Sequence, residues 1–133
     1  MKHLAALAAF GLATTLALAD PDLSKLPPAS TKTGITYATD IRPIFEVSCF
    51  RCHGEEKQKA NLRLDKLDQI PKGTGKGDVI NPTDATKSVL LIAVSGLDPQ
   101  NAMPPSRKGQ PSKGALTPEQ VGLVRAWIDQ GAK

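Results

Sequence analysis

The chain has 133 residues, which is enough for one domain and too few for two. Its formal net charge at pH 7 is +4, and its charged residues neither form a block of one sign nor alternate with aromatic residues, so we exclude nucleic acid as a partner. Aromatic residues make up only 4% of the chain, and a core this poor in large side chains favours a staple or a buried cofactor.

Residues 1–19 have the composition of a secretory signal peptide. Lys2 precedes an uncharged run rich in Ala and Leu, and Ala17 and Ala19 have the small-x-small spacing that signal peptidase recognises. We expect cleavage after Ala19, an exported or periplasmic protein, and no membrane span afterwards. An uncleaved membrane anchor is the alternative, although the run is shorter than the roughly 20 residues that a spanning helix needs.

Residues 20–36 are expected to form a flexible leader, because prolines stand there among polar residues with little apolar content. We place the domain at residues 37–133. Its first helix should begin at Thr39 or Asp40 and run, with an amphipathic pattern, directly into Cys49.

The middle of the domain is expected to hold short elements joined by loops. Residues 61–67 alternate apolar and polar side chains, which is typical of a short extended piece or of one helical turn. A helix is expected over residues 88–94, with Thr83 or Asp84 as its cap and Gly96 at its end.

The last helix has the clearest boundaries in the sequence. Thr117 is the expected N-cap, Pro118 occupies the first helical position, and Gln120 completes a capping box. Gly131 is expected to stop this helix, and an irregular segment, residues 98–114, precedes it. Helices joined by loops, with no run of buried strands, predict an all-α fold.

The run Cys49-Phe50-Arg51-Cys52-His53 has the spacing of a c-type haem attachment site. On a helical turn, Cys49 and Cys52 lie three residues apart on one face, so that both thiols can reach the two vinyl groups of one porphyrin. His53 presents its imidazole to the iron from the same face. We therefore predict one covalently attached haem c.

Two other interpretations of the cysteine pair are weaker. A thioredoxin-like redox pair needs a βαβ scaffold, and this chain has the pattern of helices and loops only. A structural zinc site needs about four Cys or His ligands, whereas the chain after residue 19 supplies three, all within one pentapeptide.

Only one histidine, His53, and one methionine, Met103, remain once residues 1–19 are removed. Met103 is therefore the candidate for the sixth ligand of the iron, in a loop stiffened by Pro104 and Pro105. The alternative is a methionine that fills a gap in the core. His/Met ligation leaves no open position for oxygen or substrate, so it favours an electron carrier over an enzyme.

Further motifs follow the cysteine pair in order: Leu62-Arg63-Leu64-Asp65, Asn81-Pro82, Ser88-Val89-Leu90, Met103-Pro104-Pro105 and Trp127-Ile128-Asp129-Gln130-Gly131-Ala132. Over roughly residues 37–132 the chain thus resembles class I c-type cytochromes, and most closely the compact planctomycete-type cytochrome c domain. This resemblance implies three to four short helices and long loops wrapped around one haem, with Phe45 and Trp127 packed where the N-terminal and C-terminal helices cross. It also implies that Arg63 is a candidate partner for a haem propionate, although a solvated surface arginine fits equally well.

The expected partners are other redox proteins, and we expect a monomer. Lysines after the haem motif could guide an acidic partner, but acidic residues interrupt them, which favours an ordinary solvated surface. The alternatives to a diffusing carrier are a haem enzyme or ligand sensor with an open sixth site, or a fixed cytochrome subunit of a larger oxidoreductase. The lysines in question are Lys57, Lys59, Lys66, Lys72 and Lys76.

Overall fold

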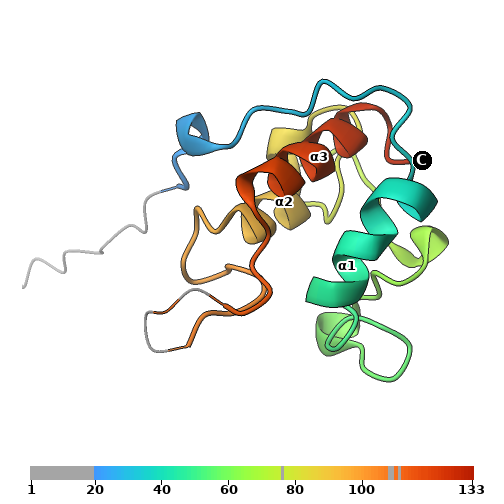
Figure 1. Ribbon diagram of the computed structural model, residues 1–133, viewed down its shortest axis with the longest axis vertical. Helices are drawn as coiled ribbons and strands as arrows, with labels where there is room; N and C mark the ends of the chain where they lie inside the picture. Colours follow the sequence, from blue (N-terminus) through green and yellow to red (C-terminus); the bar gives the residue numbers. More distant parts are fainter. Residues whose placement is uncertain (1–19, 76, 108–109, 111) are drawn as a thin grey trace, which may run out of the picture.

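The computed structural model describes residues 20–133 except residues 76, 108–109 and 111. These residues form three α-helices and no strand, namely Arg42–Ser48 (α1), Val89–Ser95 (α2) and Pro118–Asp129 (α3) (Figure 1). The all-α prediction is therefore confirmed. None of the described helices is both long and apolar enough to cross a membrane. The predicted signal peptide lies outside the described residues.

The first helix begins earlier than expected and runs into Cys49 as predicted. A π-helical turn, Tyr37–Ile41, leads into α1, and the hydroxyl of Thr36 caps this turn by accepting from the backbone N–H of Thr39 at 3.3 Å. The carboxylate of Asp40 accepts from the backbone N–H of Thr36 at 3.0 Å. Neither Thr39 nor Asp40 is the cap, because the hydroxyl that satisfies the first turn stands further upstream.

Helix α2 ends as predicted but begins differently. Gly96 terminates it in the left-handed region, with φ at +70°. Asp84 caps the 3₁₀ turn Ala85–Lys87 rather than α2. Ser88 precedes α2, but its hydroxyl accepts from the backbone N–H of Asn81 at 2.8 Å and caps nothing in the helix. The hydroxyl at the N-cap position therefore closes the loop that leads into α2.

Helix α3 matches its predicted boundaries. The hydroxyl of Thr117 accepts from the N–H of Gln120 at 3.2 Å, and the amide of Gln120 accepts from the N–H of Thr117 at 2.9 Å. This reciprocal capping box satisfies two backbone donors that the first turn leaves free. The helix ends at Gln130, and Gly131 follows with φ at +96°.

Three buried aromatic rings join the first and last helices. Phe45 and Trp127 are fully buried and meet edge to face with their ring centroids 6.3 Å apart, which confirms the packing that the resemblance implied. Tyr37 lies against both, at 6.5 Å from Phe45 and 6.1 Å from Trp127. Figure 1 accordingly shows the start of α1 beside the C-terminal end of α3.

Part of the expected leader packs on α3 as a strap, residues 26–35. Leu26 and Ile35 are buried, and the backbone N–H of Ser30 donates to the carbonyl of Gly122 at 2.9 Å. A Cβ at Gly122 would lie 2.5 Å from a strap carbonyl, so glycine permits this close approach. The expectation of a flexible leader therefore does not describe the strap, in which the prolines hold an extended segment against the helix. Further hydrogen bonds to the strap come from Arg125 to Pro27 and from Gln130 to Lys32.

Candidate cofactor site

The cysteine pair and His53 form a single turn at the end of α1. Cys49 is the C-cap of α1, and its own N–H donates to the carbonyl of Phe45 at 2.7 Å. The carbonyl of Cys49 then accepts from the N–H groups of both Cys52 and His53, at 3.0 and 2.9 Å. The spacing in the sequence thus becomes one compact backbone turn that carries all three side chains.

Gly54 follows this turn at a position that has no room for a side chain. A Cβ at Gly54 would lie 2.5 Å from the carbonyl oxygen of Phe50, which is closer than real Cβ contacts occur. Its N–H donates to the carbonyl of Lys57 at 2.8 Å, and the N–H of Lys59 returns to the carbonyl of Cys52 at 2.9 Å. The turn that carries the cysteines is therefore closed by backbone hydrogen bonds on both sides.

The surroundings of Cys49 are not those of a reactive thiol. Both cysteines are free, and burial, together with the neighbouring charge of Cys52, raises the pKa of Cys49 to about 12. Reactive cysteines have lowered pKa values, so this environment argues against thioredoxin-like chemistry. Within the described residues there is no group of three or more His, Cys, Asp or Glu side chains placed to hold a metal ion.

One ring nitrogen of His53 is buried without a hydrogen bond to any described residue. Its Nδ1 is buried and has no hydrogen-bond partner among the described residues. This leaves Nε2 as the imidazole nitrogen that a metal could reach. With two free thiols on the same turn, the donor set fits a haem attached through Cys49 and Cys52 and ligated by His53.

Met103 lies in a loop that reaches the end of α1. Its backbone N–H donates to the carbonyl of Ala93 in α2 at 2.9 Å, and its side chain is 42% exposed. From the Cβ position of Gly114, the ring of Pro104 is 3.6 Å away and the Cα of Ser48 is 3.9 Å away. Gly114 therefore lies between Pro104 in the Met103 loop and Ser48, the residue that precedes Cys49.

Apolar surface remains uncovered at this junction. Val47, one residue before Ser48, is 82% exposed. A hollow of about 290 Å³ separates this face of α1 from Gly114 and Ala115. None of the four predicted haem residues lines this hollow.

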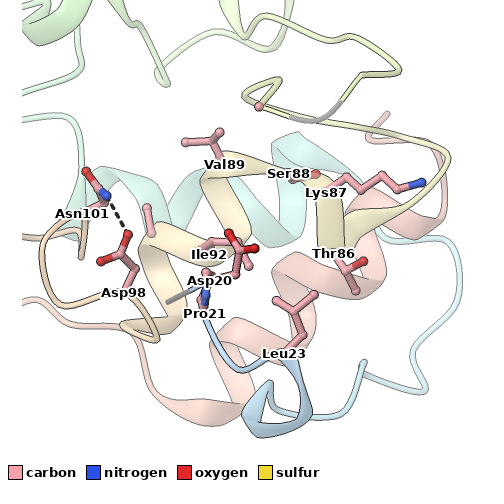
Figure 2. Close-up of a pocket in the computed structure, with 12 residues that line it drawn as sticks. Asp20, Pro21, Leu23, Thr86, Lys87, Ser88, Val89, Ile92, Asp98 and Asn101 are labelled. Carbon is pink, nitrogen blue, oxygen red and sulfur yellow. Dashed lines mark hydrogen bonds between the residues drawn. The ribbon is translucent and has the colours of Figure 1, made fainter. Parts of the chain in front are cut away.

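A larger hollow, of about 500 Å³, lies elsewhere (Figure 2). It is bounded by Leu23 on the N-terminal segment and by Ile92 on α2, and its rim includes Asp98, hydrogen-bonded to Asn101. None of the four predicted haem residues lines it. It adjoins the Met103 loop through Asp98 and Asn101, and also through Ala93, which accepts the Met103 N–H.

Arg63 forms an ion pair with Asp65. Its Nε donates to Asp65 at 2.9 Å and its Nη2 to the second carboxylate oxygen at 2.5 Å, and this hydrogen bonding raises the pKa of Arg63. Both side chains are largely buried. A propionate contact by Arg63 stays a prediction, and it would have to share the guanidinium with Asp65.

Sequence reasoning missed two residues of this site. Gly114 joins the two ends of the site, and Tyr37 donates to the carbonyl of Leu64 at 2.6 Å beside the haem motif. No local signal marks either residue, because each contact joins segments that are distant in the sequence.

Comparison with known proteins gives one family. Residues 49–107 match the family model for planctomycete cytochrome C, a span that includes both cysteines, His53 and Met103. No curated protein and no solved structure matches the chain. A cytochrome c domain implies covalently bound haem c and is generally an electron carrier. Over residues 49–107, the chain therefore matches the planctomycete cytochrome C family that the sequence motifs resemble.

Proposed function

We propose that the protein transfers single electrons through one covalently attached haem c whose iron is ligated by His53 and Met103. The observation that supports this most strongly is the single backbone turn that carries two free cysteines and His53, within a family match that also includes Met103. When bound, the haem supplies the one-electron redox couple.

The residues of the chain have separate tasks in this proposal. Cys49 and Cys52 hold the porphyrin through thioether bonds, and the buried Nδ1 of His53 leaves Nε2 for the iron. Met103 would hold the iron through its thioether, which would keep oxygen and peroxide from the iron and favour its ferrous state. The protein is then suited to moving electrons and poorly suited to catalysis at the haem.

The test uses the protein matured with haem-attachment machinery. A pyridine haemochrome assay should report covalent haem, and the oxidised spectrum should show the band near ~695 nm that marks Met sulfur on ferric iron. Met103→Ala should lose this band, whereas Ser106→Ala in the same loop should keep it. A chain without covalent haem contradicts the cofactor assignment. High-spin ferric iron in the unsubstituted protein contradicts the carrier role and supports an enzyme or sensor.

We propose in addition that the carrier works outside the cytoplasm with other redox proteins as its partners. The supporting observation is the signal-like composition of residues 1–19. Intact mass of protein expressed with its full N-terminus should show a chain that begins at Asp20. Retention of residues 1–19 in membrane fractions would instead indicate an uncleaved anchor.

A further inference from the structure

Tyr37 is connected to His53 by two successive hydrogen bonds. The hydroxyl of Tyr37 donates to the carbonyl of Leu64 at 2.6 Å, and the N–H of Leu64 donates to the carbonyl of His53 at 2.8 Å. Tyr37 is 6% exposed and Leu64 is 3% exposed, so water does not compete freely for either bond. Removing the Tyr37 hydroxyl would leave the buried carbonyl of Leu64 without its hydrogen-bond donor.

Tyr37 is itself held rigidly. Its ring packs against Phe45 and Trp127, and its backbone N–H donates to the carbonyl of Lys133 at 2.7 Å. The indole N–H of Trp127 donates to the same carbonyl at 3.0 Å. The hydroxyl therefore projects from the buried aromatic cluster of Tyr37, Phe45 and Trp127.

The segment 59–64, which contains the acceptor Leu64, also forms backbone hydrogen bonds to the haem motif. The carbonyl of Cys52 accepts from Lys59 and the carbonyl of His53 accepts from Leu64, so residues 59–64 make hydrogen bonds to two consecutive residues of the motif. Residues 62–64 lie in no helix, and the backbone at Leu62 is extended. The bond from Tyr37 is thus an anchor between this irregular segment and the aromatic core.

We propose that Tyr37 is a positioning residue for the haem ligand His53, acting through Leu64. This inference rests on the proposed function and deepens it. Groups behind a metal ligand fix its orientation, and losing one typically changes metal affinity by 10- to 100-fold. Without the hydroxyl, residues 59–64 are held less firmly, and the backbone of His53 is held less firmly with them.

The test compares haem-loaded Tyr37→Phe with haem-loaded Thr117→Ala in the full chain. Tyr37→Phe keeps the ring and its packing and removes only the hydroxyl. Thr117→Ala removes the cap at the far end of α3 and lowers global stability without touching the Tyr37–Leu64–His53 connection. Hydrogen exchange at the Leu64 amide reads the bond to His53 directly, and the midpoint potential reads the iron.

In Tyr37→Phe, exchange at the Leu64 amide should accelerate at least tenfold beyond what the fall in global stability accounts for. A tenfold change in the relative affinity of His53 for ferric and ferrous iron corresponds to about 59 mV for one electron, so we expect a potential shift of that order. Thr117→Ala should show neither effect. Covalent haem with unchanged Leu64 exchange and potential in Tyr37→Phe overturns this inference alone. Absence of covalent haem in the unsubstituted protein overturns the proposed function as well.

Discussion

The substitution Gly122→Ala tests whether the N-terminal segment packs on α3. It should destabilise the protein if the strap is packed there and stabilise it if residues 20–36 form a flexible leader. In the structure the strap crosses α3 at this residue, where an added Cβ would lie 2.5 Å from the carbonyl oxygen of Pro28 and 3.6 Å from the backbone N of Ser30. If residues 20–36 were a flexible leader, Gly122 would be an ordinary helical glycine. Gly122→Ala separates the two cases.

The magnitude follows from three terms. Alanine gains about 1 kcal/mol over glycine inside a helix. Forcing an extra carbon into a packed contact costs about 1 to 3 kcal/mol, and here the opposing atom belongs to a backbone carbonyl that cannot rotate away. If the strap shifts, the hydrogen bond from Ser30 to Gly122, 2.9 Å long, is also lost, at about 0.5 to 1.5 kcal/mol. We expect a net loss of roughly 0.5 to 3.5 kcal/mol in the free energy of unfolding.

The assay is urea denaturation of the haem-loaded protein, followed by far-ultraviolet circular dichroism. A second pair of proteins, with and without Gly122→Ala in a chain that lacks residues 20–31, completes a double-mutant cycle. There the opposing carbonyl is gone, and Gly122→Ala should stabilise by about 1 kcal/mol. Stabilisation of the full-length chain by the same amount would refute the packing of the strap on α3.

Three further outcomes are expected. Burial raises the pKa of Tyr37 from its ordinary 10.0 to about 12, so the unfolded chain releases this proton first as pH rises. The free energy of unfolding should therefore be fully retained below pH 10 and should fall by about 2 to 3 kcal/mol as pH rises to 12; an equal fall in Tyr37→Phe would contradict this cause. Thr117→Ala should lower the free energy of unfolding by about 1 kcal/mol through loss of the capping box, as measured by the urea midpoint, and an unchanged midpoint would show that the cap contributes nothing. Gly54→Ala should reduce the yield of covalent haem, because its Cβ would collide with the carbonyl of Phe50 and distort the turn that aligns the cysteines. A haemochrome assay against Thr117→Ala, which lowers stability without touching the cysteine turn, checks this, and equal yields would argue against it.

Features whose cause lies within one helical turn could be predicted from the sequence alone. The capping box of Thr117 and Gln120, the stop at Gly96 and the compact turn from Cys49 to His53 all depend on residues three or four positions apart, or on one residue alone. In each case the hydrogen-bonding groups are adjacent whatever the rest of the chain does. The haem motif belongs to this class, and the matched family agrees with its interpretation.

Features that depend on distant segments were decided only by the tertiary structure. Asp84 was expected to cap α2 but caps the turn Ala85–Lys87, and prolines that suggested a flexible leader lie in a strap fixed to Gly122. The contact between Tyr37 and Leu64 spans 27 residues of sequence. Such contacts form because burying apolar surface brings segments together, and the hydrogen bonds made there depend on which backbone groups then face each other. The sequence determined which residues can hold a haem, whereas the packing of α1, α3 and the Met103 loop decided which residues support them.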